Sequence, residues 1–300
     1  MTLVVIGGAT ATGKSDLTVE LAGRIGGEVV NADSMQLYRG MDIGTAKLSL
    51  EERKGIAHHM LDLVEVSTDV NVAWYQERAR ATIDALLTQQ IPVIVVGGTG
   101  FYIKAILDDL NFPETDPLVR EKLTQEAEKI GADALHQRLG KLDPAAAAAI
   151  PRENVRRVIR ALEVIEITGK PFTANLPREN STKYPQALQF GLTTDRELLD
   201  ARVDLRVEKM FENGLIREVE GLIGAGLLEG KTARAALGYA QVIAALEGEI
   251  TMDEAISQTK VATRQYIRRQ ETWFRRDQRI TWLEESSDRA ATIEKAILTS

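Results

Sequence analysis

Residues 7–16, GGATATGKSD, constrain the fold of this chain more than any other stretch. An apolar run, Leu3–Ile6, precedes them, and a helical pattern begins near Asp16. The fixed positions of the phosphate-loop spacing G-x-x-x-x-G-K-[ST] are held by Gly8, Gly13, Lys14 and Ser15. Glycines let successive N–H groups face one anion, and the helix N-terminus adds positive charge. A plain glycine turn into a helix is the alternative, but strand, spacing and helix all favour a phosphate site.

The composition suits an enzyme of the cell interior. The chain has 300 residues, 44% hydrophobic and 27% charged, which is enough for a proper core and two domains. It has no cysteine and three histidines, so disulfides and thiolate chemistry are excluded and a zinc site is disfavoured. No apolar run reaches membrane-spanning length, and we expect a cytoplasmic monomer without a membrane partner. The net charge of -7 argues mildly against a general nucleic-acid coat but does not describe local clusters.

Strand and helix patterns alternate in the first part of the chain. Strands are expected at Leu3–Ile6, Glu28–Asn31 and within 91–100, with helices from Asp16 to Ile25 and from Val72 to Gln89. This order predicts an α/β core with a parallel sheet flanked by helices, like that of P-loop NTPases. Helical periodicity alone follows residue 112, and FGLTT (190–194) offers one more strand. We therefore predict a catalytic core of residues 1–112 and 190–300, with an all-helical insertion domain and its return linker at 113–189.

The acidic residue that a nucleotide hydrolase needs at the end of a second strand is not where it is expected. The strand Val93–Val96 ends in glycines and a threonine, which weakens a reading as an ATP hydrolase. Asp33 instead follows Val29–Val30, at the carboxyl end of the second strand and beside the phosphate loop. A carboxylate there can hold magnesium through water or accept a proton. A cap or turn role for Asp33 is an equally good interpretation of ADS.

Two rows of arginines stand out in this acidic chain. If residues 152–165 are helical, Arg152, Arg156 and Arg160 share one side of the helix. A second row of Arg264, Arg268, Arg275 and Arg279 is expected on a helix over 263–279, with Tyr266, Ile267, Trp273 and Phe274 on its far side as core residues. Solvated helix faces are the default interpretation. Binding to phosphates along a polynucleotide is the alternative, because arginine binds phosphate bidentately.

Seven motifs, in order and spacing, resemble those of bacterial tRNA dimethylallyltransferases, also called tRNA isopentenyltransferases. They are GGATATGKS, NADSMQLYRGMDIGTAK, HHMLD, VGGTGFYIKA, RALEVIEITGKP, ALGY and RRQETWF, and they run from about residue 4 to 282. The resemblance implies a P-loop core with a helical insertion. It also implies transfer of a dimethylallyl group from dimethylallyl diphosphate to the exocyclic amine of the adenosine 3′ of the anticodon in tRNA. Diphosphate is released, and Mg²⁺ is the implied cofactor.

The resemblance also assigns roles to residues. Asp33 becomes the general base, Thr10 joins it as a catalytic residue, and Arg202 and Arg206 belong to the diphosphate site or the reaction channel. The phosphate-loop spacing itself places the Ser15 hydroxyl to ligate magnesium. The phosphate loop, whose spacing is typical of ATP sites, would instead bind the diphosphate of the donor. This loop consists of Gly8, Ala9, Thr10, Ala11, Thr12, Gly13, Lys14 and Ser15. Contacts to tRNA fall on Asp33, Ser34, Met35, Gln36, Thr99, Arg120, Arg156, Arg157, Arg160, Arg268, Arg269, Gln270, Trp273 and Arg275.

Some points stay open in the sequence. Ala9 stands where the family often has proline, and Ala240 where it often has lysine or arginine, so one tRNA contact is in doubt. Surface pairing with Asp204 or Glu208 is an alternative role for Arg202 and Arg206. Two other functions fit the loop and Asp33: a P-loop transferase acting on small molecules, and a non-catalytic RNA-binding module that uses nucleotide as a switch. Neither the choice of tRNA nor movement of the insertion can be predicted.

Overall fold

A fully parallel sheet forms the centre of the computed structural model, which describes residues 2–175, 181–285 and 288–299. The strand order is β3-β2-β4-β1-β5-β6. The strands are β1 (Leu3–Gly8), β2 (Glu28–Asn31), β3 (His58–His59), β4 (Val93–Gly97), β5 (Leu188–Leu192) and β6 (Ile280–Leu283). The predicted parallel α/β core is confirmed, whereas β3 and β6 were not anticipated. Because β1 lies between β4 and β5, the loop that follows it opens at the middle of the sheet.

Alternation along β1 divides the core into two layers. Val4 and Ile6 pack with α1 (Lys14–Ile25) and α11 (Arg289–Thr299) on one face. Leu3 and Val5 pack on the other face with α2 (Val72–Thr88), α3 (Gly100–Leu107) and Phe274 at the end of α10 (Met252–Phe274). Helices cover both faces, so the strands read as continuous apolar runs rather than as alternating ones.

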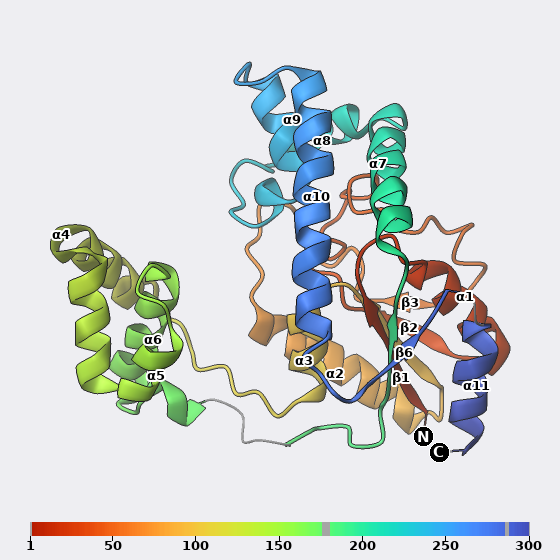
Figure 1. The fold of residues 1–300 in the computed structure, drawn as a ribbon, viewed down its shortest axis with the longest axis horizontal. Helices are drawn as coiled ribbons and strands as arrows, with labels where there is room; N and C mark the ends of the chain where they lie inside the picture. The colour runs from red at the N-terminus through yellow and green to blue at the C-terminus, as the bar shows by residue number, and fades with distance from the viewer. Residues whose placement is uncertain (1, 176–180, 286–287, 300) are drawn as a thin grey trace. The chain divides into compact units, whose positions relative to one another are not determined.

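A group of helices near the carboxyl end of the chain packs over the loops of the sheet. It consists of α7 (Arg196–Glu212), α8 (Leu215–Gly224), the short 3₁₀ turn η2 (Ala233–Ala235), α9 (Tyr239–Leu246) and α10. One apolar cluster joins Val203 and Val207 of α7 with Ile267 of α10 and with Ala9 of the phosphate loop. Figure 1 shows α10 running from this group down to the strands. The loop is thus held by tertiary packing as well as by its own turns.

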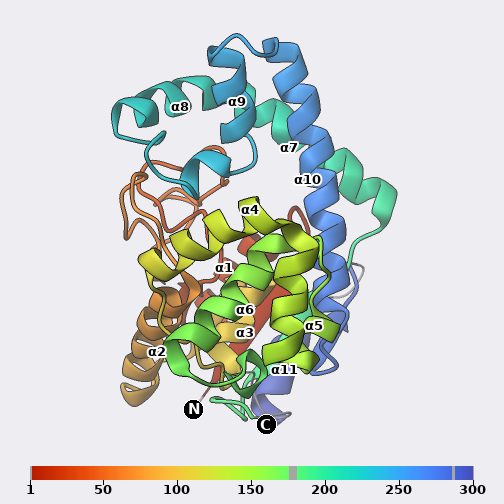
Figure 2. The ribbon, with the colours of Figure 1, turned by 90° about the vertical axis from the view of Figure 1, so that its left-hand side faces the viewer.

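The chain divides into two compact units, Met1–Leu107 with Tyr184–Ser300 and Asp108–Lys183. The second unit contains α4 (Pro117–Leu142), α5 (Pro144–Ala149), α6 (Val155–Thr168) and η1 (Phe172–Asn175), around Leu123, Leu139, Leu162 and their neighbours. Figure 2 shows α4 and α6 side by side. Its two ends meet: Asp108 and Thr182 form an antiparallel bridge, and the Asp109 N–H donates to the Ser181 carbonyl at 3.1 Å.

The unit boundaries differ from the predicted 113–189. Tyr184 already belongs to the first unit, where its hydroxyl donates to Asp84 at 2.8 Å. The strand expected at 190–194 begins at Leu188. Residues 176–180 of the predicted return linker lie outside the described residues. None of the described helices combines the length and the apolarity needed to cross a bilayer.

Candidate active site

The loop between β1 and α1 has the backbone of an anion cradle. Gly8 has φ +139° and Gly13 has φ +85°, conformations that favour glycine, and Ala11 also lies in the left-handed region at φ 65°. A Cβ on Gly8 would lie 3.3 Å from backbone atoms of Leu192, so a side chain there is also crowded. The helix begins at Lys14, two residues before the predicted Asp16. The N-terminus of α1 therefore adjoins the loop, as phosphate binding requires.

Three hydrogen bonds fix the interior of this loop. The Ala9 carbonyl accepts the Thr12 hydroxyl at 2.8 Å and the Lys14 ammonium at 2.6 Å. From outside the loop, the Thr10 N–H donates to Oε1 of Gln270 in α10 at 2.9 Å. The loop is preorganised by the protein itself, so binding an anion costs little ordering.

A large cavity of about 810 Å³ lies against the loop. Both signs of charge line it, with six cationic and five acidic side chains among the described residues. Its charged lining residues are Lys14, Asp16, Asp33, Asp42, Lys47, Glu52, Arg202, Arg206, Lys209, Glu285 and Arg289. The hydroxyl-bearing Ser15 is exposed and lines the same space. This combination suits a polyphosphate group with a hard divalent cation.

The cavity environment lowers the pKa of both Lys14 and Arg206. Burial, together with the neighbouring Arg206 charge, lowers the pKa of Lys14 to about 7, although Asp33 opposes the shift. Burial also lowers the pKa of Arg206, again opposed by Asp33. Two cations held close together with one carboxylate favour an incoming anion, which would restore the charge balance.

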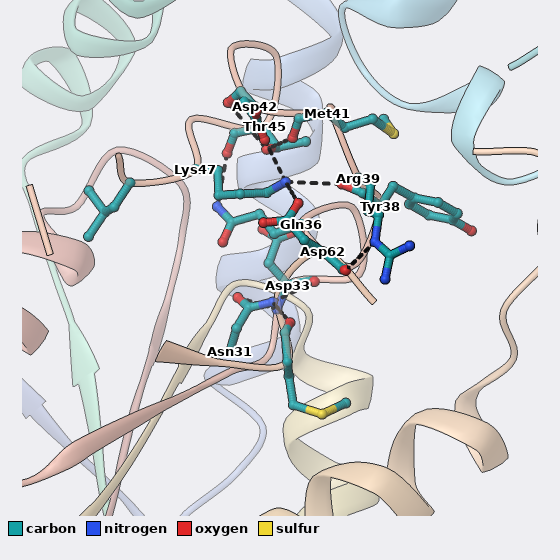
Figure 3. A network of polar contacts seen from close by, with 12 residues as sticks. Asn31, Asp33, Gln36, Tyr38, Arg39, Met41, Asp42, Thr45, Lys47 and Asp62 are labelled. Atoms are coloured by element: carbon teal, nitrogen blue, oxygen red, sulfur yellow. Dashed lines mark hydrogen bonds and ion pairs between the residues drawn. The ribbon is translucent and has the colours of Figure 1, made fainter. Parts of the chain in front are cut away.

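Asp33 forms a local turn and also faces the cavity. Its Oδ1 accepts the Met35 N–H at 2.9 Å, the local bond of a turn-forming aspartate. Asn31 fixes the backbone of Asp33 by accepting its N–H at 3.1 Å and donating to its carbonyl at 3.0 Å (Figure 3). The side chain also lines the large cavity. The turn therefore holds one carboxylate oxygen and leaves the other for a ligand.

The segment that follows Asp33 is fastened by a second network, which Figure 3 shows. The buried Lys47 ammonium donates to Asp42 at 2.6 Å, Asp62 at 2.5 Å and the Tyr38 carbonyl at 3.0 Å. The Thr45 carbonyl then accepts Gln36 Nε2 at 3.1 Å and Arg206 Nη2 at 3.5 Å. All three ammonium protons of Lys47 are engaged, so it holds the cavity wall rather than a ligand.

A smaller cavity of about 330 Å³ adjoins the first. The two share the lining residues Thr10, Asp33, Thr45, Arg206 and Met210. The rest of the smaller cavity is mostly apolar, with Val207, Leu237 and Tyr239 among its walls, and Tyr266 and Arg269 lie at one side. Two compartments that meet at a carboxylate and a cation suit a reaction between two substrates.

Gln270 lies elsewhere than its assigned role requires. It is 5% exposed, and its amide donates to the Gly98 carbonyl at 2.9 Å while accepting from Thr10. A Cβ on Gly98 would lie 2.3 Å from Nε2, so the amide packs directly on that backbone. Both ends of the side chain are used within the protein. We therefore assign Gln270 to the support of the phosphate loop and not to tRNA contact.

The predicted arginine row on 263–279 is only partly formed. The helix ends at Phe274, before Arg275 and Arg279, and Arg279 pairs with Asp277 at 2.5 Å. Arg264 pairs with Asp204 of α7 at 2.9 Å. What stays exposed is a shorter group of Arg268, Arg269, Arg275 and Arg276. Ile267 and Phe274 are core residues as predicted, whereas Tyr266 and Trp273 are half-buried.

Trp273 lies between the core and this basic surface. Its ring packs on Gly100, where a Cβ would lie 2.1 Å from the indole, and edge-on against Phe274. A surface cleft of about 270 Å³ is lined by Arg268, Arg269, Thr272, Trp273 and Arg276. An aromatic edge among arginines matches the mix of stacking and phosphate contacts that single-stranded RNA uses.

Three arginines of the second unit are placed differently from the prediction. Helix α6 begins at Val155, so Arg152 precedes it and pairs with Glu153 at 3.0 Å. Arg120 and Arg160 donate to the fully buried Glu163 at 2.8 and 2.9 Å. Burial alone would raise the pKa of Glu163, but these hydrogen bonds and charges hold it below its usual value. Arg156 and Arg157 are exposed and available for a partner.

Other predicted residues hold the cavity walls. Ser34 and Met35 line the smaller cavity and Gln36 the larger one, while the Thr99 hydroxyl accepts the Ser34 N–H at 3.2 Å. Arg202 pairs with Glu285 and not with Asp204 or Glu208, the partners of the alternative surface role. Those two carboxylates instead bind Arg264 and Lys260.

Three contributors to the site were missed: Lys47, Tyr266 as a cavity residue, and Arg289. Lys47 lies in the motif DIGTAK, and nothing in the neighbouring sequence indicates that its ammonium is buried. Arg289 reaches the loop from the carboxyl-terminal helix. Positions 289 and 12 are far apart in the chain, so their contact is visible only in the folded structure.

Comparison with known proteins agrees with the motifs. A family model described as IPP transferase matches residues 36–277. The tRNA dimethylallyltransferase of Streptomyces coelicolor is 55% identical over 281 residues, covering 94% of this chain and 89% of that protein. The enzyme of that name from Corynebacterium diphtheriae is 49% identical over 287 residues, covering 96% and 95%.

Solved structures give the same relationship. The full-length tRNA isopentenylpyrophosphate transferase of Bacillus halodurans matches with a TM-score of 0.71 at 38% identity, over 99% of this chain and 95% of that one. A eukaryotic dimethylallyltransferase acting on tRNA matches with a TM-score of 0.83 at 28% identity, over 99% and 77%. The chain therefore belongs to the IPP transferase family, whose members named here are tRNA dimethylallyltransferases.

Proposed function

We propose that this protein transfers the dimethylallyl group of dimethylallyl diphosphate to the exocyclic amine of the adenosine that follows the anticodon in tRNA. The observation that carries the proposal is the wall shared by the two cavities. Thr10, Asp33 and Arg206 lie between a cationic space beside a phosphate loop and a smaller, mostly apolar space. A donor with a charged end and an apolar end fits across such a junction.

At the allylic carbon, the reaction forms one bond and breaks one. The amine nitrogen bonds to the allylic carbon, the carbon–oxygen bond breaks, and its electron pair leaves with the diphosphate. An adenine amine is a poor nucleophile because its lone pair is delocalised into the ring, so Asp33 assists by accepting the amine proton as the new bond forms. Lys14, Arg206 and the loop N–H groups face the charge that builds on the leaving diphosphate.

Magnesium fits the chemistry of the larger cavity. The Ser15 hydroxyl is an exposed hard oxygen donor at the N-terminal end of α1, the place that such a loop offers a divalent cation. When bound with the donor, Mg²⁺ supplies charge neutralisation for the departing diphosphate. Ser15 would be its protein ligand.

The exposed arginines supply a surface for the RNA. Arg268, Arg269 and Arg275 lie on or just past α10, close in sequence to Tyr266 of the smaller cavity. The target base must leave its stack to reach a closed cavity, so backbone contacts are needed to hold the loop while one base enters. All lining residues of both cavities come from a single unit of one chain, which supports action as a monomer.

Transfer of a labelled donor tests the proposal. Dimethylallyl diphosphate labelled in the allyl group is incubated with the protein, Mg²⁺ and unmodified tRNA, and with a tRNA that carries guanosine 3′ of the anticodon as the control. Label in the first tRNA and not in the second is the expected result. Phosphate transfer from ATP, or labelling of free AMP with tRNA inert, would establish a small-molecule transferase instead.

A further inference from the structure

Arg289, the first residue of α11, joins three segments at the edge of the larger cavity. Its Nη1 donates to the Thr12 carbonyl of the phosphate loop at 3.2 Å. Its Nη2 donates to the Thr193 carbonyl beyond β5 at 2.6 Å and to the Leu283 carbonyl of β6 at 3.4 Å, and its Nε to the Glu284 carbonyl at 3.0 Å. The loop is thus tied to the ends of two neighbouring strands.

The number of donors decides what this arginine can do. A guanidinium carries five N–H groups, and four of them are directed at backbone carbonyls here. A bidentate contact to a phosphate needs two parallel donors, and only one remains. Arg289 lines the larger cavity but is committed to the backbone, so it acts on a ligand through the loop.

The geometry of the peptide bond explains how Arg289 affects a ligand that it does not contact. A trans peptide is planar, with its C=O and its N–H pointing in opposite directions, and the structure contains no cis peptide among the described residues. When the Thr12 carbonyl points to Arg289, the N–H of Gly13 must point away from it. Gly13 has φ +85° and no side chain to resist rotation of that peptide plane.

We propose that Arg289 is a positioning residue for the diphosphate: it holds the Thr12–Gly13 peptide in the orientation that presents the Gly13 N–H to the anion. The inference rests on the proposed role of the loop as the diphosphate site. Thr12 is 2% exposed and its hydroxyl is bound to Ala9, so its side chain is held independently of Arg289. Only the peptide plane depends on the arginine.

The chain offers a matched control for this inference. Arg24 of α1 also connects with α11, through Glu294 at 3.6 Å, but its other partner is Glu20 on its own helix. Replacing Arg24 removes an α1–α11 ion pair without touching the loop. Arg289→Gln, Arg289→Lys and Arg24→Gln therefore separate loop orientation from docking of the last helix.

The direct test is to measure the binding of inorganic pyrophosphate, in the presence of Mg²⁺, by titration calorimetry. Arg289→Gln is expected to weaken binding about 10- to 100-fold, the value of one hydrogen bond to a charged group. Arg289→Lys keeps a cation that can reach a carbonyl and is expected to recover part of the loss. Arg24→Gln is expected to bind like the unchanged protein.

Kinetics give a second measurement. In the Arg289→Gln variant the KM for dimethylallyl diphosphate is expected to rise, while the affinity for tRNA stays unchanged. Unchanged pyrophosphate binding in that variant, or an equal loss in Arg24→Gln, would overturn the inference. Pyrophosphate binding that depends on Arg289, in a protein that does not label tRNA, would overturn the proposed function and leave this inference standing.

Discussion

The pH dependence of donor binding follows from the pKa of Lys14. With that pKa lowered to about 7, the side chain is largely neutral in the free enzyme above neutral pH. A bound diphosphate favours the charged ammonium, so binding takes up about half a proton per site near pH 7 and nearly one at about pH 9. The affinity is then proportional to the charged fraction of free Lys14, which falls about 50-fold between about pH 7 and about pH 9.

The direction of the pH effect distinguishes titration of Lys14 from titration of the donor. The diphosphate of the donor gains negative charge as pH rises, which alone would strengthen binding to a cationic site. A fall in affinity therefore points to loss of charge on the protein. Calorimetric titration of the donor at several pH values, in buffers that differ in ionisation heat, measures both the affinity and the number of protons taken up.

The Lys14→Arg variant is the control, because a guanidinium keeps its charge throughout this range. We expect weaker binding at neutral pH in this variant, but no steep fall above it. An affinity of the unchanged protein that is flat over the same range, with no proton uptake, would refute the reasoning and show that Lys14 is charged before the donor arrives.

Three further changes probe the base, the loop support and the RNA surface. Asp33→Asn is expected to slow single-turnover transfer about 100- to 10,000-fold, the usual contribution of a general base, while tRNA binding is retained; a normal rate would remove Asp33 from that role. Gln270→Leu leaves Thr10 N–H and the Gly98 carbonyl unpaired, so urea denaturation should show a free energy of unfolding lower by about 2–5 kcal/mol; an unchanged midpoint would contradict this. Arg268→Glu should weaken tRNA binding and reduce the slope of log affinity against log salt by about 1, and an unchanged slope would exclude phosphate contact.

The sequence predicted the parts of the fold that depend on neighbouring residues. The loop spacing, the apolar strands and Asp33 at a strand end are local patterns, and the structure places them together as expected. The strand β6 was missed because its partner β5 lies far away in the chain and its residues at 280–282 are not buried.

Pairing of charges could not be predicted in the same way. Arg264 has the same helical spacing as the exposed arginines, but its carboxylate partner Asp204 comes from another helix. Arg160 pairs with Glu163 three residues along its own helix, and Arg120 reaches the same carboxylate from α4. Gln270 is separated from Thr10 by 260 positions in the chain, and no periodicity indicates such a contact. Spacing shows which residues share a helix face, and only the fold shows which of them are already occupied.

The paired ends of the helical unit have a consequence for how such enzymes change over evolution. Asp108 and Thr182 lie on adjacent antiparallel segments, so the chain leaves and re-enters the core at nearly one point, and Tyr184 is anchored immediately afterwards. Insertions at such a point break no strand pairing and no core packing. The whole unit can therefore be lengthened, shortened or exchanged in evolution while the sheet and the phosphate loop are inherited unchanged.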